Sequence, residues 1–345
     1  MIRCIDRSKV EPSLVLLDGR DELSRSLEPD DCPVLRLETA KLLGVSAIRA
    51  ARCLVRFWSQ NRPDIVQSYF LDSCYFSLPL ARVMGIRATV RVQNNLGYWL
   101  TPRHRLLNRL LRRCVARTVT NSESGRDAIL RAERLLADKV AVIENGVDLE
   151  CHPDVTEPMQ NLDEIVVGCV ANLRPVKNIK GLLRVAKDLC ERFPCLRFSI
   201  AGDGEQRDEL ERLRTTLGLG ERVVFLGSVA NVPAFLRTID IAVLPSHSEG
   251  MSNALLEYLA AGRAVVATDV GANARLLDRG ACGLLVAPND DNALRAAIAR
   301  LLNDPRLARF LAAAGRARVE AEFGREAMCR RFERFYRELH ASVLR

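Results

Sequence analysis

Two glutamates on either side of a short polar turn are the residues of this chain best suited to chemistry. Glu249 and Glu257 lie eight positions apart, shortly after the apolar run of residues 239–244. The turn between them begins with four residues, Gly250, Met251, Ser252 and Asn253. At the carboxyl end of a parallel strand, backbone N–H groups can bind phosphates and carboxylates can bind hydroxyls. The segment therefore predicts a site for a phosphate-bearing ligand such as a sugar nucleotide.

Basic side chains that suit the same ligand follow an earlier apolar run, residues 165–170. Lys177 lies between this predicted strand and a predicted helix, where its ammonium can contact a diphosphate. Arg174 can add a planar, bidentate contact, and Ser252 can cap a helix whose dipole also favours phosphate. Negative charge grows on the leaving oxygen as the bond to a diphosphate breaks, so these groups lower the barrier. Because they can replace a divalent cation, and the sequence has no Asp-x-Asp motif, we expect no metal.

The segments that hold these residues alternate between strand-like and helix-like patterns. From residue 165 onward, helix-period segments separate six short β-rich runs: 165–170, 197–201, 223–226, 239–244, 264–268 and 283–286. This alternation predicts βαβ units, with a parallel sheet and helices on both of its faces. A weaker alternation precedes residue 165. We therefore expect an α/β fold with two doubly wound, Rossmann-like domains that face a central cleft.

Four regions follow from this reading: a first domain, a Pro-containing linker, a second domain and a final helix that can cross back to the first domain. Their predicted bounds are 1–150, 151–163, 164–323 and 324–345. The first plausible strand, residues 14–17, has no glycine-rich phosphate loop after it, although a Rossmann-like domain normally begins with such a loop. The sequence thus predicts that the first domain lacks its usual first strand–helix unit.

Composition and sequence pattern argue against a membrane-spanning, secreted or disulfide-rich protein. The chain has 345 residues, of which 48% are hydrophobic, and this suits two globular domains. No apolar run approaches the roughly 18–20 residues that a membrane span needs, and the N-terminus has no signal-peptide pattern. The eleven cysteines are scattered without a Cys-x-x-Cys pair, so we expect reduced thiols. These features predict a cytoplasmic protein.

Positive charge is concentrated in one stretch of the first half. The formal net charge is +8, and residues 73–122 contain many arginines but no acidic residue. Within this stretch, the segment from Pro102 to Arg117 reads as a helix with four leucines on one side: Leu106, Leu107, Leu110 and Leu111. Such a helix can lie on the anionic inner face of a membrane, but solvated arginines on an ordinary surface helix explain the pattern equally well. Since few aromatics and no recognised motif accompany the arginines, we expect no nucleic-acid partner.

With these residues in place, the chain resembles the retaining glycosyltransferases of family 4, also called group 1 glycosyltransferases, which have the two-domain GT-B fold. The most specific motif is Glu-x7-Glu, formed here by Glu249 and Glu257. Three further motifs stand in family order, at residues 145–148, 170–178 and 201–204. One motif alone would be weak evidence, whereas four in order are specific. The resemblance covers nearly the whole chain.

The resemblance implies a role for each candidate residue. Glu257 would hold the ribose hydroxyls of the donor, and Glu249 would lie near the transferred sugar and stabilise positive charge at its anomeric carbon. Lys177 and Arg174 would act on the diphosphate as catalytic cations. The other donor-binding residues would come from the turns: Asn172, Gly204, Gly250, Met251, Ser252 and Asn253. No cofactor is implied beyond the nucleotide-sugar donor.

The chain departs from the family pattern at several positions. Asn172 stands where an arginine is common, and Arg275 stands where the family's Gly-Gly-x-x-Glu motif has its carboxylate. Many relatives carry a histidine in the first domain, close to the reacting sugar. The corresponding stretch here contains Asn94 and Asn95, which we assign to the acceptor side.

The implied activity is transfer of a sugar from a UDP- or GDP-sugar to an acceptor hydroxyl, with retention of configuration. The acceptor is expected to be a saccharide or a lipid-linked molecule in cell-surface polysaccharide or glycolipid synthesis. Two alternatives stay open at this point. One is a non-catalytic or weakened sugar-nucleotide-binding protein, because a unit of the first domain is predicted to be absent. The other is a sugar-nucleotide epimerase of the same fold, against which the Glu-x7-Glu motif and the small number of histidines argue.

Overall fold

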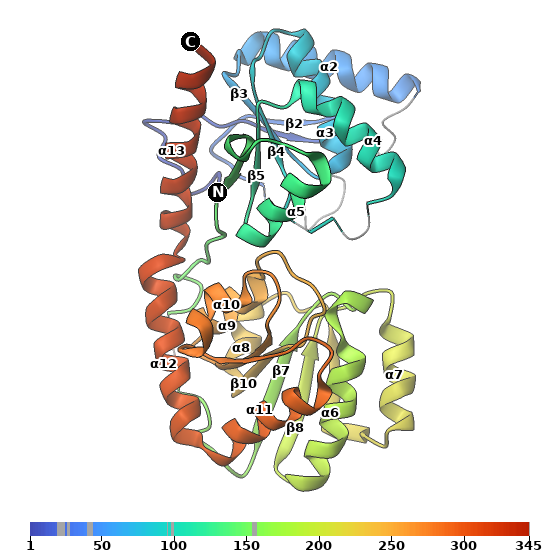
Figure 1. The fold of residues 1–345 in the computed structure, drawn as a ribbon, viewed down its shortest axis with the longest axis vertical. Helices are drawn as coiled ribbons and strands as arrows, with labels where there is room; N and C mark the ends of the chain where they lie inside the picture. The colour runs from blue at the N-terminus through green and yellow to red at the C-terminus, as the bar shows by residue number, and fades with distance from the viewer. Residues whose placement is uncertain are drawn as a thin grey trace. The chain divides into compact units, whose positions relative to one another are not determined.

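Two units of α/β structure make up the chain (Figure 1). Unit 1 consists of Met1–Glu144 and Glu326–Arg345, and unit 2 consists of Asn145–Arg325. The structure is a computed structural model that describes residues 1–18, 25, 28–39, 44–94, 96–97, 100–153 and 157–344. The described part of the predicted linker lies within unit 2. There, Met159 is buried and donates its backbone N–H to Asp240 Oδ1 at 2.6 Å.

Unit 2 is built on a parallel sheet whose strands alternate with helices, as the sequence predicts. The strands are β7 (Ile165–Val170), β8 (Leu196–Ala201), β9 (Val223–Gly227), β10 (Ile241–Leu244), β11 (Ala264–Thr268) and β12 (Leu284–Val286). They are hydrogen-bonded in the order β12-β11-β10-β7-β8-β9. The direction of this order reverses between β7 and β10, and at such a point the loops after the two strands diverge to leave a crevice.

Helices cover both faces of this sheet (Figure 1). One face carries α6 (Ile179–Arg192), α7 (Arg207–Thr216) and α11 (Asp291–Asn303). The other carries α8 (Val232–Arg237), α9 (Asn253–Ala260) and α10 (Asn273–Leu276). Helix α12 (Pro305–Glu322) packs with Leu311 in the first of these cores and with Val319 in the second. The packed helices fix the loops at the carboxyl edge of the sheet.

Unit 1 contains parallel strands in two separate sheets. In one, β1 (Leu14–Leu16) pairs with β2 (Val34–Arg36). In the other, β3 (Ile65–Tyr69), β4 (Ala88–Val92), β5 (Arg117–Thr120) and β6 (Val140–Val142) pair in that order. Within the described ranges, β1 and β3 each have a single neighbour, so one edge of each strand is unpaired there. The absence of a first strand–helix unit stays a prediction.

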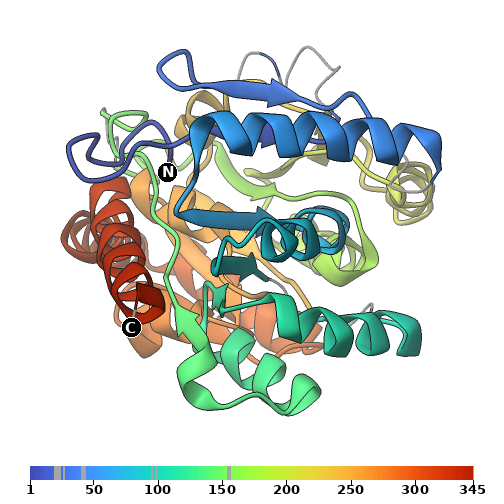
Figure 2. The same ribbon diagram turned by 90° about the horizontal axis from the view of Figure 1, so that it is seen from above.

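The helices of unit 1 form two cores with these strands. Helices α2 (Val45–Asn61) and α3 (Leu71–Val83) bury Leu54, Trp58 and Leu78 in one core. The other core combines Phe332 and Tyr336 of helix α13 (Arg325–Leu344) with residues of β4 and of the N-terminal segment. The N-terminal segment lies beside α13 (Figures 1 and 2). Helices α4 (Pro102–Leu111) and α5 (Glu123–Glu133) complete the unit.

A covalent link joins the two ends of the chain within unit 1. Cys4 and Cys329 form a disulfide, so the expectation of reduced thiols is wrong for this pair. The remaining nine cysteines are free.

No helix in the part of the chain that the structure describes combines the length and apolarity needed to cross a bilayer.

Candidate active site

The predicted donor-binding residues of unit 2 lie at the carboxyl edge of its sheet. Lys177 ends the 3₁₀ turn η3 (Pro175–Lys177) after β7, Gly204 follows β8, and Glu249 follows β10. Because β7 and β10 are neighbours where the strand order reverses, the loops of Lys177 and Glu249 meet at the crevice. Residues 72 positions apart in sequence are thereby brought together.

An ion pair joins these two loops. Lys177 Nζ lies 2.6 Å from Glu249 Oε1, and Ser246 Oγ donates to the same oxygen at 2.7 Å. The His247 N–H donates to the Val176 carbonyl at 2.8 Å, which ties the loop backbones together. Both charged side chains are largely buried, so they attract each other more strongly than in water. The pair holds a cation and an oriented carboxylate side by side, which suits a ligand with both phosphates and hydroxyls.

Helix α9 begins in the loop that carries Glu249. Its N-cap is Ser252, whose hydroxyl accepts a hydrogen bond from the Leu255 N–H at 3.3 Å. The first N–H groups of a helix have no carbonyl partner within it, and the helix dipole makes this end positive. Met251 is buried, whereas Asn253 is exposed. The amino end of α9 is thus suited to bind a phosphate.

Glu257 lies on the second turn of α9 and is half-buried. No hydrogen bond or ion pair to its carboxylate occurs within the described residues. Burial raises the pKa of this carboxyl, because desolvation disfavours its charged form. A partly desolvated carboxylate with no cation beside it is suited to accept hydrogen bonds from the hydroxyls of a ligand.

Arg174 and Asn172 occupy the loop between β7 and η3. Both are exposed, and neither side chain has a hydrogen-bond or ion-pair partner in the described ranges. Gly204 approaches the same loop closely, since a Cβ on it would lie 2.8 Å from the backbone of Leu173. These residues line the carboxyl edge and are available to a ligand there.

Gly271, in the loop after β11, allows this loop to lie directly against the backbone of Glu249. It has φ +59°, and a Cβ there would lie 2.2 Å from the Glu249 carbonyl oxygen and 2.5 Å from that of Gly250. The Ala272 N–H donates to the same Gly250 carbonyl at 2.8 Å. The loop after β11 therefore supports the loop that carries Glu249.

Gly271→Ala is accordingly expected to displace the Glu249 loop and to weaken donor binding by about 10- to 100-fold. Gly218→Ala is the matched control, because Gly218 also has a positive φ, +67°, but nothing lies within 4 Å of its added Cβ. The positive φ should cost each variant roughly 1 kcal/mol of unfolding free energy, and the clash adds to this loss in Gly271→Ala. Calorimetric titration with the nucleotide would contradict this role of Gly271 if the two variants bound equally well.

The candidate residues of the acceptor side belong to unit 1. Asn94 follows β4 and is exposed, whereas Asn95 lies outside the described residues. In unit 2, Arg275 pairs with Glu322 at 2.7 Å, and its guanidinium lies 5.0 Å from the centroid of the Phe323 ring. The cation that replaces the family's carboxylate therefore makes packing contacts at the end of α12.

Two residues of the site had no role assigned from the sequence. Ser246 orients Glu249, and Asn145 donates its amide N–H to Asn253 Oδ1 at 2.7 Å. The sequence did mark Asn145, because this residue begins one of the family motifs. Its hydrogen-bond partner Asn253 lies 108 positions away, so the contact itself was not predicted. For Ser246 the only signal was its place between β10 and Glu249, three residues before the acid.

Two parallel-sheet units, with a cation–carboxylate pair where the strand order of unit 2 reverses, are the features expected of a glycosyltransferase of the GT-B fold. Residues 156–318 match the family model described as glycosyl transferases group 1, and residues 1–151 match that described as glycosyltransferase family 4. The chain therefore belongs to glycosyltransferase family 4.

Similar proteins include enzymes with defined names. The chain is 26% identical over 280 residues to the UDP-Gal:alpha-D-GlcNAc-diphosphoundecaprenol alpha-1,3-galactosyltransferase of Escherichia coli, covering 75% of this chain and 72% of that protein. It is 30% identical over 295 residues to the lipopolysaccharide core biosynthesis mannosyltransferase LpcC of Rhizobium leguminosarum bv. viciae, covering 81% and 76%. Among solved structures, Anabaena Alr3699/HepE in complex with UDP and glucose superposes with a TM-score of 0.81 at 20% identity, covering 94% of this chain and 99% of that one. This likeness shows the fold.

Proposed function

We propose that this glycosyltransferase is retaining and metal-independent, and that it moves a sugar from a UDP- or GDP-sugar to an acceptor hydroxyl. The main support is the Lys177–Glu249 pair beside the amino end of α9. In the proposed complex, Lys177 and the first N–H groups of α9 bind the diphosphate, and Arg174 turns in to assist. Glu257 accepts hydrogen bonds from the ribose hydroxyls. These groups supply the positive charge that a divalent cation would otherwise provide.

The proposed reaction uses the same pair. In the free protein, Lys177 neutralises Glu249. A bound diphosphate competes for the ammonium, so Glu249 becomes available to the sugar hydroxyls and to positive charge at the anomeric carbon. The bond from that carbon to the diphosphate breaks, and the acceptor oxygen attaches on the same face. The acceptor proton passes to the leaving phosphate. Because the new bond forms on the face that the diphosphate leaves, configuration is retained without an enzyme nucleophile.

The names of similar proteins narrow the choice of donor and acceptor. One relative is named for UDP-Gal and a diphosphoundecaprenol-linked sugar, another for the lipopolysaccharide core, and a structural neighbour contains UDP and glucose. On this basis we favour a UDP-sugar as donor and a saccharide or lipid-linked acceptor in cell-surface polysaccharide or glycolipid synthesis.

Peripheral contact with an anionic membrane is a second proposal, which rests on α4. Leu106, Leu107 and Leu110 are 59%, 45% and 64% exposed, and arginines flank them on the same helix. Leu111, predicted on the same side, is instead buried in the core of unit 1. The helix also ends at Leu111 and not at Arg117, which begins β5, so the prediction is wrong on both points. Exposed leucines beside arginines suit a helix that lies at a lipid interface. A cytoplasmic location at the inner membrane face stays a prediction.

Calorimetric titration with UDP, GDP and ADP tests the donor, and we expect UDP to bind most tightly. Turnover of the matching nucleotide-sugar, measured with a chelator present, should persist, and NMR of the product should show the donor's anomeric configuration. Binding without turnover would leave a sugar-nucleotide-binding protein in place of an enzyme. Activity that vanishes with the chelator and returns with Mg²⁺ would contradict metal independence, and an inverted product would contradict retention.

A further inference from the structure

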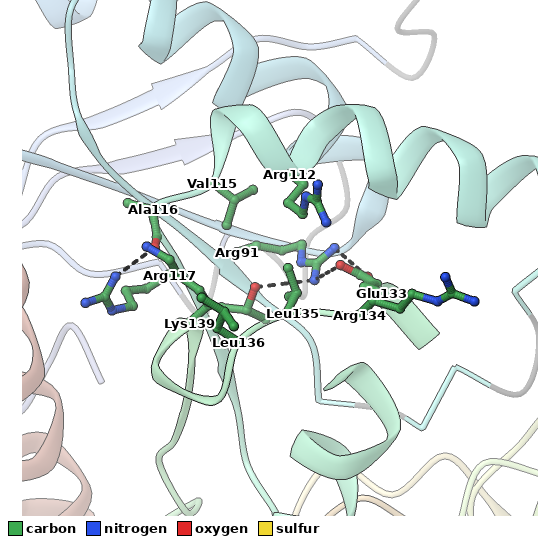
Figure 3. A pocket seen from close by; sticks show the side chains of 11 residues that line it. Arg91, Arg112, Val115, Ala116, Arg117, Glu133, Arg134, Leu135, Leu136 and Lys139 are labelled. Atoms are coloured by element: carbon green, nitrogen blue, oxygen red, sulfur yellow. Dashed lines mark hydrogen bonds and ion pairs between the residues drawn. The ribbon is translucent and has the colours of Figure 1, made fainter. Parts of the chain in front are cut away.

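A cavity of about 390 Å³ lies in unit 1 (Figure 3). It is bordered by the first residue of β5, Arg117, by the turn η1 (Arg112–Cys114) after α4, and by the turn η2 (Ala137–Lys139) before β6. Its position is therefore at the amino ends of β5 and β6. Ligand crevices of open α/β sheets lie at the opposite, carboxyl ends, so the catalytic site does not account for this cavity.

A buried ion pair lines the cavity. The two terminal nitrogens of Arg91 lie 2.9 and 2.8 Å from the two carboxylate oxygens of Glu133, and Asn108 donates to Glu133 at 3.3 Å. Arg91 is 1% exposed, and its Nε has no hydrogen-bond partner in the described part of the chain. Glu133 is the one acidic side chain among the lining residues, and Arg91 neutralises it. The other basic side chains of the lining therefore have no acidic partner in the cavity.

Four further basic side chains line the cavity: Arg112, Arg117, Arg134 and Lys139. Figure 3 shows Arg112 and Lys139 on different sides of the Arg91–Glu133 pair, with Arg117 and Arg134 extending outward at the edges. In the described ranges none of the four forms an ion pair. Asp138, beside Lys139 in sequence, is exposed and does not line the cavity. Uncompensated cations around a concave site attract and hold anions.

We propose that this cavity is a second anion site, which binds the phosphate of an organic phosphate ester. Guanidinium groups match the geometry of phosphate oxygens, and the excess of basic over acidic side chains in the lining suits a phosphate, with up to two negative charges, better than a carboxylate. The volume falls in the range of small-molecule sites and is too large for a phosphate ion alone. Val115, Leu135 and Leu136 supply apolar lining for the group that the phosphate esterifies. Either the head group of an anionic lipid or a soluble phosphorylated metabolite has this chemistry.

The test compares two variants of equal charge in the full-length protein. The cavity variant carries Arg112→Gln, Arg134→Asn and Lys139→Gln. Asparagine is chosen at position 134 because Arg134 has φ +52°, a conformation that asparagine tolerates well. The control variant carries Arg49→Gln, Arg52→Gln and Arg56→Gln, three exposed arginines of α2 in the same unit. Thermal unfolding shows whether each variant folds. If the cavity variant does not fold, the single variants Arg112→Gln and Lys139→Gln take its place.

Two probes separate the two sources of phosphate. One is glycerol 3-phosphate in solution, followed by calorimetry, and the other is phosphatidylcholine vesicles with or without phosphatidylglycerol, followed by co-sedimentation. We expect the cavity variant to lose at least about tenfold in affinity for one probe, and the control variant much less. Loss with the soluble ester identifies a metabolite site, and loss with the phosphatidylglycerol vesicles alone identifies a lipid site. No binding by the wild type, or equal loss in both variants, would overturn the proposal. The nucleotide affinity of the cavity variant should match that of the wild type. Failure of the cavity proposal can therefore be distinguished from failure of the proposed donor site.

Discussion

Replacing Lys177 by alanine is expected to lower kcat for sugar transfer by about 10²- to 10³-fold, the usual effect of removing one preorganised group that stabilises transition-state charge. The reason is the position of its ammonium, 2.6 Å from Glu249 and at the point where the strand order reverses. In the proposed complex this cation faces the leaving diphosphate, on which negative charge grows as the bond breaks. Steady-state kinetics with the matching nucleotide-sugar measures the loss.

Lys180→Ala provides the matched control. Lys180 is a lysine three positions further on, at the start of α6, and pairs with Glu209 away from Glu249. Its loss should leave kcat within about twofold of the wild type, as expected for an exposed ion pair. Lys177→Arg should recover only part of the activity, because a planar guanidinium does not replace a compact ammonium. Equal rates for Lys177→Ala and Lys180→Ala would remove Lys177 from the mechanism.

The coupling between Lys177 and Glu249 can be measured with the same assay. If the two side chains act as one unit on the bound donor, the double variant Lys177→Ala, Glu249→Gln should lose much less than the product of the two single losses. Independent roles would give multiplicative losses.

The sheet of unit 2 could be predicted closely from the sequence, for a physical reason. Its parallel strands are buried on both faces, so each reads as a short apolar run between helix-period segments. All six strands lie within two residues of their predicted ranges. The positions of Lys177 and Glu249 after strands were predictable in the same way, whereas their direct contact depends on β7 and β10 being neighbours.

Contacts that depend on loop conformation could not be predicted. Nothing local distinguishes Ser246 from other serines until the loop brings its hydroxyl to Glu249. The role of Gly271 likewise depends on the approach of a backbone that precedes it by more than twenty residues. The same limit applies in unit 1, where helical periodicity placed Leu111 with the exposed leucines of α4 although it packs into the core.

Glu257→Gln is expected to change donor binding and stability in opposite directions. In the proposed complex the carboxylate accepts hydrogen bonds from the ribose, and such bonds to a charged group contribute about 1.5–3 kcal/mol. Nucleotide affinity should therefore fall by roughly 10- to 100-fold. In the free protein the same carboxylate is half-buried and has no partner among the residues that the structure describes, so the neutral amide should raise the unfolding free energy by roughly 0.5–1 kcal/mol at neutral pH.

The pH dependence of this gain identifies its cause. Burial raises the pKa of Glu257 above the ordinary glutamate value of 4.5, so between these two pKa values the folded protein binds more protons than the unfolded chain. The unfolding free energy of the wild type therefore falls as the pH rises through this window, and the penalty is complete above the raised pKa. The advantage of Glu257→Gln should be largest at neutral pH and should disappear below about pH 4.5.

Chemical denaturation at several pH values, with and without nucleotide, measures both effects in one experiment. Glu191→Gln is the control, because Glu191 is an exposed glutamate of α6 paired with Lys187 and should change neither quantity appreciably. A variant that binds nucleotide as tightly as the wild type would remove Glu257 from the donor site. A variant that is less stable at neutral pH would instead mean that the carboxylate has a partner in the free protein. The combination of weaker binding and greater stability is the signature of a residue kept for its ligand, at a cost to the fold.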